Sequence, residues 1–320
     1  MSVRRIILDT DVAMGAPGSD IDDGFAMALA VDLKDQSLEL VTTVNGNIDV
    51  DTSTVLALHL LDRLGKPDIP VVCGARTPLV RPLHAHPARD RVADVREHLS
   101  GRKPTPGRAA TAIIDHVLAN PGEISIVAIG PLTNVAVALA LEPALATAVK
   151  EIVIMGGAFL RTTSVLAMPG EFNIWVDPEA AAIVLNSGAP LRFIGLDVTL
   201  QVELNRADAD RLMATGRPFA SYAGECAHAW IDYLREAYPG RDFCTAPMHD
   251  ALAVAVVSRP NLVTWRPARV EVEVTSDLTR GVTVADLLAS RDPPQANCMV
   301  ATEVDSVAFI EFFLNHIYSL

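Results

Sequence analysis

The chain has 320 residues, of which 50% are hydrophobic, and a net charge of -13 at pH 7. A chain of this length and apolar content can bury a large core, and its even composition favours a single α/β domain over residues 1–320. The negative charge argues against nucleic acid as a partner, because proteins that bind nucleic acid usually carry basic patches.

No segment predicts targeting or a membrane span. The N-terminus enters an apolar strand without the features of a signal peptide. The most apolar window, residues 124–141, is interrupted by Gly130-Pro131 and reads as strand, turn and helix. The 4 cysteines lack paired metal spacing and are too few for a disulfide framework, which fits a reducing compartment. We therefore expect a cytoplasmic protein without a membrane partner.

Short apolar strands alternate with helical segments along the chain. The expected strands are residues 6–8, 38–44, 69–73, 124–129, 151–155 and 191–196, and the expected helices begin at Gly24 and cover 55–64, 109–118, 134–141 and 178–186. Helices at 206–237 and 250–257, a hairpin of 269–275 with 281–284, and a helix at 304–317 follow. Continuous apolar strands between helices predict an α/β fold with a mostly parallel open sheet flanked by helices, Rossmann-like at its core.

The loop after the first strand is the most informative segment of the chain. It carries five aspartates, namely Asp9, Asp11, Asp20, Asp22 and Asp23. Capping of the following helix would explain one of them, but not five. Carboxylates that crowd together repel one another, so the cluster favours a hard cation or proton transfer.

Other polar residues follow later strands of the expected sheet. Asn47 follows the second strand, residues 130–134 and Gly156-Gly157 follow the next ones, and Asp197 follows the last. Open parallel sheets bind ligands beyond the carboxyl ends of their strands, so these residues predict one composite site with the aspartate loop.

Two further clusters are candidates for the same site. Glu171 and Asn173 flank Phe172, and His249-Asp250 stands at the start of an apolar helix. Asp250 could instead be the N-cap of that helix, and His249 could be a structural histidine.

The polar, proline-containing segment 81–108 is the expected mobile loop. Its histidines, His84, His86 and His98, could line a site, although histidines in loops are mostly solvated.

Six motifs occur together in one order along the chain. They are the acids Asp9-Thr10-Asp11 with Asp22-Asp23, then TTVNGN at 42–47, GPLTN at 130–134, MGG at 155–157, EFNIWVDPE at 171–179 and HD at 249–250. A single pair of aspartates is a weak signal, but the ordered series closely resembles the signature of the inosine-uridine preferring nucleoside hydrolases. The resemblance implies one α/β domain that binds Ca²⁺ and hydrolyses the N-glycosidic bond of ribonucleosides, and a homodimer or homotetramer.

The same resemblance implies a role for individual residues. The ion would be held by Asp11, Asp23, the main-chain carbonyl of Thr133 and Asp250, with Asp11 also the general base toward water. The ribose 2′- and 3′-hydroxyls would be bound by Asp22, Asn47, Asn173 and Asp250, and the 5′-hydroxyl by Glu171. His249 is the candidate proton donor to the leaving base, and Trp230, Tyr233 and Tyr238 could stack on that base or simply pack.

The chain departs from the family pattern in three places. The loop between Asp11 and Asp22 has about seven extra residues and the additional Asp20, so which of the acids at 20, 22 and 23 binds the ion is open. The usual Gly-Asn is missing between Gly157 and Glu171, which leaves recognition of the 5′ end open. The usual HGxxG after residue 82 is also absent, and the nucleobase preference is open with it.

Two alternatives come from other classes of protein. The pair Asp9 and Asp11 is also similar to the Asp-x-Asp of Mg²⁺-dependent phosphohydrolases, but Lys150 precedes its strand where that family would need a lysine after one. A non-catalytic nucleoside or ribosyl sensor fits the missing Gly-Asn, whereas the presence of Asp11 and Asp250 argues against it.

Overall fold

A computed structural model of the chain describes residues 3–81, 102–160, 164–165, 168–288 and 290–320. The histidines His84, His86 and His98 lie outside the described residues, so the expectations for them stay predictions. Within the described part, no helix is both long and apolar enough to cross a membrane.

The described strands form one large sheet in the order β12-β11-β13-β8-β5-β4-β1-β2-β3. Its members are β1 (Arg4–Thr10), β2 (Gln36–Thr43), β3 (Val71–Cys73), β4 (Ile124–Ala128), β5 (Glu151–Met155), β8 (Leu191–Ile194), β11 (Val263–Val272), β12 (Thr283–Asp286) and β13 (Cys298–Val304). From β3 to β13 every neighbouring pair is parallel, and β11 pairs antiparallel with both β13 and β12. Two small antiparallel sheets, β6 (Ser164–Val165) with β7 (Met168–Pro169) and β9 (Glu203–Asn205) with β10 (Thr245–Pro247), lie apart from it.

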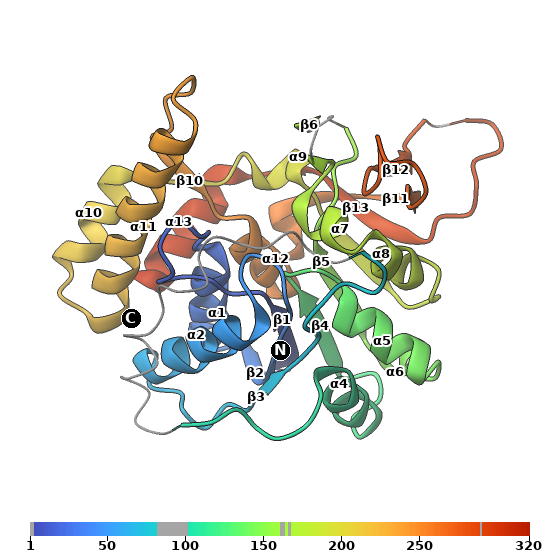
Figure 1. Ribbon diagram of the computed structural model, residues 1–320, viewed down its shortest axis with the longest axis horizontal. Coiled ribbons are helices and arrows are strands. Elements are labelled where there is room, and N and C mark those ends of the chain that lie inside the picture. Colours follow the sequence, from blue (N-terminus) through green and yellow to red (C-terminus); the bar gives the residue numbers. More distant parts are fainter. Residues whose placement is uncertain (1–2, 82–101, 161–163, 166–167, 289) are drawn as a thin grey trace.

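Helices cover both faces of the sheet (Figure 1). The longer ones are α1 (Asp22–Asp32), α2 (Val50–Arg63), α4 (Ala109–Leu118), α5 (Thr133–Leu141), α8 (Pro178–Leu185), α10 (Arg206–Ala214), α11 (Pro218–Ala237), α12 (His249–Ser258) and α13 (Ser306–Ile317). Short helices α6 (Leu145–Ala148), α7 (Phe172–Val176), α9 (Leu196–Thr199) and the 3-10 turn η1 (Pro260–Leu262) lie between them.

Alternate side chains of each strand enter two separate cores. In β1, Ile6 and Leu8 pack with α1, α2, α12 and α13, whereas Ile7 packs on the other face with α4, α5 and α8. All three are fully buried, as the period of two along a strand requires when both faces are covered. The predicted α/β fold with a mostly parallel, helix-flanked sheet is confirmed.

The C-terminal third differs most from the sequence prediction. Strand β13 was not predicted, although it joins β8 to β11 in the sheet. Its sequence, CMVATEV, does not alternate clearly between apolar and polar residues, and several of its side chains are only partly buried. The helical region expected over 206–237 consists of two helices, which separate where Gly216 adopts a positive φ of 64° and Pro218 starts α11.

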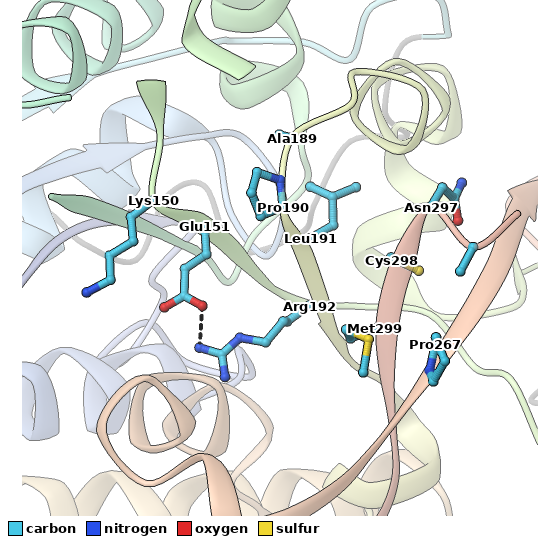
Figure 2. A pocket seen from close by; sticks show the side chains of 11 residues that line it. Lys150, Glu151, Ala189, Pro190, Leu191, Arg192, Pro267, Asn297, Cys298 and Met299 are labelled. Atoms are coloured by element: carbon cyan, nitrogen blue, oxygen red, sulfur yellow. Dashed lines mark ion pairs between the residues drawn. The ribbon is translucent and has the colours of Figure 1, made fainter. Parts of the chain in front are cut away.

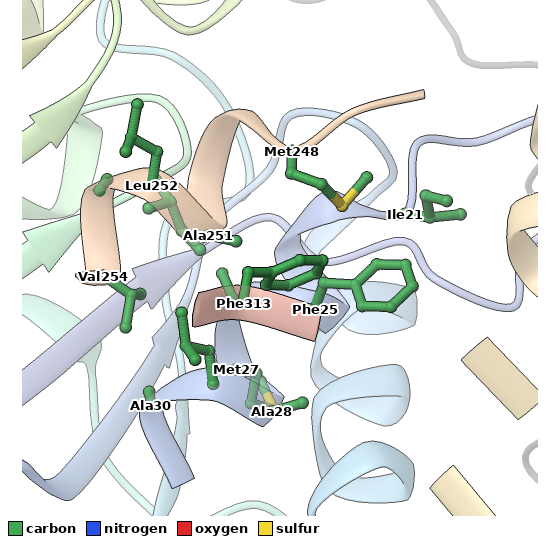
Figure 3. Packing of buried hydrophobic residues seen from close by; sticks show 14 of the residues in the cluster. Ile21, Phe25, Met27, Ala28, Ala30, Met248, Ala251, Leu252, Val254 and Phe313 are labelled. Carbon is green, nitrogen blue, oxygen red and sulfur yellow. The ribbon is translucent and has the colours of Figure 1, made fainter. Parts of the chain in front are cut away.

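The N-termini of α1 and α12 meet over an apolar cluster (Figure 3). Ile21 and Met248, each just before one of these helices, are buried there with Phe25 of α1. The Phe25 ring meets the ring of Phe313 edge-on at 5.5 Å. This packing brings two segments that are more than 200 residues apart to one end of the sheet, and each begins with acids.

Candidate active site

Three aspartates form a compact cluster where α1 and α12 begin. Asp22, Asp23 and Asp250 each have a carboxylate oxygen within 4.8 Å of the others, and all three are buried. The backbone N–H of Asp250 donates to Asp22 Oδ2 at 3.1 Å. Helix N-termini favour negative charge, so the two helices together make this concentration of acids tolerable.

Asp11 joins this cluster through Asn47. The backbone N–H of Asn47 donates to Asp11 Oδ2 at 2.6 Å, and the Asn47 side-chain amide donates to Asp23 Oδ2 at 3.1 Å. Asp11 is fully buried, and among the described residues no donor reaches its other oxygen, Oδ1. A Cβ at Gly46 would lie 1.9 Å from Asp11 Oδ2, so the turn can approach the carboxylate this closely only as glycine.

Burial and mutual repulsion perturb these acids strongly. Desolvation, followed by the charge of neighbouring aspartates, raises the pKa of Asp11, Asp22 and Asp250 well above the usual range. Desolvation also raises the pKa of Asp23 to about 7. Buried carboxylates either keep their protons or need a cation, and hard divalent ions prefer carboxylate oxygens. The four acids, with Asp11 Oδ1 unpaired, therefore fit a metal ion.

Asp20 lies at the edge of the cluster. It is half-buried, and its Oδ1 accepts from the N–H of Ile21 at 2.7 Å. Its charge contributes to the raised pKa of Asp22, yet within the described chain the acids whose oxygens converge are Asp22, Asp23 and Asp250.

The segment before α5 borders Asp11 on the other side. A Cβ at Gly130 would lie 2.8 Å from Asp11 Oδ1, so the backbone at Gly130 lies directly against this carboxylate. Thr133 is buried, and its hydroxyl donates to Asp177 Oδ2 at 2.6 Å. The hydroxyl is therefore committed to Asp177, which agrees with a main-chain role for Thr133.

Glu171 and Asn173 tie the strand ends together. Glu171 is the N-cap of α7, and its carboxylate accepts the N–H groups of Asn173 at 2.7 Å, Ile174 at 3.0 Å and Gly157 at 3.1 Å. Burial raises the pKa of Glu171 to about 7, and its charge contributes to the raised pKa of Asp11. The Asn173 amide donates to the carbonyl of Ile129 at 2.9 Å. Glu171 is thus close enough to Asp11 to affect its pKa, and Asn173 is bonded to the carbonyl that directly precedes Gly130.

His249 precedes Asp250 and is half-buried. Its Nδ1 pairs with the hydroxyl of Thr199 at 2.6 Å. Desolvation lowers the pKa of His249 to about 4, so the ring is neutral at pH 7. When the Thr199 hydroxyl donates to Nδ1, Nε2 carries the proton and can donate to a ligand.

Trp230 and Tyr233 lie on α11 and are not part of the acidic cluster. Their rings stack with centroids 5.4 Å apart at an interplanar angle of 14°. Tyr233 is 41% exposed, and Tyr238, after the helix, is also exposed.

Two residues of the site were missed by sequence reasoning. Thr10 donates from its buried hydroxyl to Asp23 Oδ1 at 2.5 Å, and the fully buried Asp177 accepts from Thr133 and from the N–H of Leu79. Both residues lie within motifs of the sequence, Thr10 between Asp9 and Asp11 and Asp177 in EFNIWVDPE, and this position indicated that they could belong to the site. Their hydrogen-bond partners could not be predicted, because those partners are distant in the sequence.

A groove at the opposite edge of the sheet is unrelated to these acids (Figure 2). It has a volume of about 420 Å³ and lies at the amino ends of β5, β8 and β13. Glu151 and Arg192 form an ion pair of 2.6 Å there, and none of the predicted site residues lines it.

Known proteins match this chain over nearly its whole length. The family described as inosine-uridine preferring nucleoside hydrolase matches residues 6–311. A non-specific ribonucleoside hydrolase, RihC, of Salmonella paratyphi C is 38% identical over 311 residues, which cover 95% of this chain and 94% of the relative. An uncharacterized protein of Schizosaccharomyces pombe is 37% identical over 320 residues, 98% of each chain.

Solved structures agree with the sequence comparisons. A plant nucleoside hydrolase superposes with a TM-score of 0.88 and 32% identity over 99% of both chains. A purine-preferring ribonucleoside hydrolase from Gardnerella vaginalis gives a TM-score of 0.86 and 30% identity over 99% of this chain and 98% of that one. The chain therefore belongs to the inosine-uridine preferring nucleoside hydrolase family and is an N-glycosyl hydrolase.

Proposed function

We propose that this enzyme hydrolyses the N-glycosidic bond of ribonucleosides to free base and ribose in a Ca²⁺-dependent reaction. The observation that carries the proposal is the meeting of Asp11, Asp22, Asp23 and Asp250 at the carboxyl ends of the strands, with Asp11 Oδ1 unpaired among the described residues. The relatives support the substrate class, since the Salmonella protein is named a non-specific ribonucleoside hydrolase.

Asp11, Asp23, Asp250 and the main-chain carbonyl of Thr133 are the proposed ligands of the ion. Oxygen donors of this kind suit Ca²⁺, which when bound would hold the attacking water and the ribose diol and make that water more acidic.

Asp11 is the proposed general base. Asn47 fixes one of its oxygens, so the unpaired Oδ1 is the atom that can take a proton from water. The sugar becomes oxocarbenium-like as the base departs, and the surrounding carboxylates stabilise its positive charge more than they stabilise the ground state.

The remaining acids and amides bind the sugar in this proposal. Asp22, Asn47, Asn173 and Asp250 would bind the 2′- and 3′-hydroxyls, and Glu171 the 5′-hydroxyl. Because the Glu171 carboxylate already accepts three backbone N–H groups, it would recognise the 5′ end through a remaining lone pair.

His249 is proposed to donate a proton to the departing base from Nε2; the neutral ring must first take up a proton, and the imidazolium then returns to the neutral form as the base leaves. Trp230 and Tyr233 are proposed to lie beside the base. A free base leaves far more readily when it is protonated, and a positioned acid typically contributes about 10²- to 10⁴-fold.

The described acids that converge do not include Asp9, which a phosphohydrolase would use as its nucleophile. Asp9 is fully buried, and its Oδ1 accepts from the Thr42 hydroxyl at 2.5 Å and the Asn134 amide at 2.8 Å. The expected cytoplasmic location, the absence of a nucleic-acid or membrane partner, and the homodimer or homotetramer stay predictions.

The deciding experiment measures reducing-sugar release from inosine, adenosine, guanosine, uridine, cytidine and 5′-methylthioadenosine. Each is tested before and after calcium chelation and again after addition of Ca²⁺ or Mg²⁺. Release that is lost on chelation and restored by Ca²⁺ is expected. Full turnover after exhaustive chelation would contradict the metal role, and no release by the folded, calcium-loaded protein would favour a sensor.

A further inference from the structure

The extra residues between Asp11 and Asp22 form an ordered, packed loop, here called the strap (residues 12–19). Val12, Ala13 and Met14 are fully buried. Backbone hydrogen bonds within the strap join Ala16 N–H to the carbonyl of Ala13 at 2.9 Å and Ser19 N–H to that of Ala16 at 3.3 Å. The first half of the strap is therefore part of the core, whereas Pro17 and Gly18 are exposed.

The strap contacts helix α11 at two tyrosines. The Tyr222 hydroxyl donates to the carbonyl of Met14 at 3.5 Å, and a Cβ at Gly15 would lie 2.1 Å from that hydroxyl. A Cβ at Gly18 would lie 2.9 Å from Cε2 of the Tyr233 ring. Tyr222 and Tyr233 are about three helical turns apart and so share one face of α11.

The Tyr233 ring is held on two sides and open on another. Trp230 stacks on it, and Gly18 touches its edge, yet Tyr233 is still 41% exposed. Gly18 precedes Asp22 by four residues, which span at most about 14 Å even when extended. The strap therefore connects the exposed ring to the acidic cluster through a short stretch of chain.

We propose that the strap determines nucleobase specificity by holding the Tyr233 ring where it stacks on the leaving base. The inference rests on the proposed function, because it assigns the base end of the same site. An aromatic ring offers every base a flat apolar face, and a larger base overlaps it over more area. The strap would therefore favour purine over pyrimidine nucleosides.

The test compares Tyr233→Ala and Gly18→Ala with the wild-type enzyme. Steady-state kinetics are measured with inosine and uridine, together with inhibition by 1,4-dideoxy-1,4-iminoribitol, a cationic sugar that has no base. We expect kcat/KM for inosine to fall about tenfold or more in both variants, and by less for uridine, while Ki for the iminoribitol stays within about twofold.

Three comparisons separate the strap from general damage. Gly65→Ala is the matched control, since Gly65 has a φ of 66° against 73° at Gly18 but no atom within 4 Å of its Cβ position. Tyr233→Phe keeps the ring and is expected to recover most of the loss. The double variant Gly18→Ala/Tyr233→Ala should be no worse than Tyr233→Ala alone, because both changes act through one ring.

Several results would overturn the inference. These are an unchanged kcat/KM in Tyr233→Ala, an equal loss for inosine and uridine, a parallel rise in Ki for the iminoribitol, or additive effects in the double variant. Failure of the proposed function is a different result, since the wild-type enzyme would then release ribose from no nucleoside.

Discussion

Asn47 is the residue that relates Asp11 to the rest of the acidic cluster. By donating its backbone N–H to Asp11 and its side-chain amide to Asp23, it leaves Asp11 Oδ1 as the oxygen without a protein donor in the described structure. A general base needs a carboxylate oxygen that is free to accept a proton. Asparagine has the same shape as aspartate but no carboxylate, so it should not replace Asp11.

Asp11→Asn should reduce ribose release by at least about 10²-fold and leave the fold intact, because the amide cannot accept the proton from water. Turnover and thermal unfolding of the calcium-loaded protein measure the two effects. Asp277→Asn is the matched control, since Asp277 is an exposed aspartate whose ion pair with Arg81 should contribute little. Near wild-type turnover by Asp11→Asn would assign the base elsewhere.

His249→Gln tests the proposed proton donor. The proposed donor is the protonated ring, which returns to the neutral form when it gives up its Nε2 proton, so loss of His249 should matter only when the leaving group needs a proton. We expect kcat for inosine to fall by about 10²-fold or more, while p-nitrophenyl riboside, whose leaving group departs as an anion, is hydrolysed almost normally. Equal losses for both substrates would show that His249 is not the acid.

At the scale of elements, α7 depends on Glu171 for its N-cap. Glu171→Ala would leave the buried N–H groups of Asn173, Ile174 and Gly157 without an acceptor, so we expect a loss of about 1–3 kcal/mol in the free energy of unfolding. Urea unfolding measures it.

Activity should also fall in Glu171→Ala, because α7 carries Asn173, which is proposed to bind the ribose hydroxyls. The control is Asp305→Ala, which removes the exposed N-cap of α13 and its bond with the N–H of Ala308 at 3.0 Å. That change should cost about 0.5–2 kcal/mol without affecting turnover. Normal activity in Glu171→Ala would show that α7 does not contribute to the active site.

For the whole molecule, the buried acids link stability to pH and to calcium. Desolvation raises the pKa of Asp23 and Glu171 to about 7 and that of Asp9 to about 6, from ordinary values of 3.8 to 4.5. The native metal-free protein therefore holds these protons more tightly than the unfolded chain. The stability that these three acids contribute is therefore fully present below about pH 4 and is lost as the pH rises through 7.

We expect the Tm of the metal-free protein to fall between about pH 5 and pH 8, and Ca²⁺ to raise it more at the higher pH, where the acids are charged. Asp23→Asn should flatten the pH dependence and weaken the calcium effect. A calcium-induced shift of Tm that is larger at pH 5 would contradict the assignment of these acids to the ion.

Local patterns were sufficient for most of the sheet and for the existence of the site. The apolar runs of β1 and β5 and the aspartates after β1 are properties of neighbouring residues, and they predicted strands and an acidic site. The pattern missed β13 and did not locate the break between α10 and α11 near Gly216. At β13, pairing with β8 and β11 decides the structure, and at Gly216, a single backbone angle does.

The sequence by itself determined the fold class, the family and the candidate residues, because these depend on residue type and spacing. Only the tertiary structure decided that Asp22, Asp23 and Asp250 converge, that Asp11 keeps one oxygen unpaired and that the strap contacts Tyr233. Contacts between residues this far apart in the chain depend on how α1, α11 and α12 pack, and burial among these elements, not the acids' own chemistry, raises their pKa values.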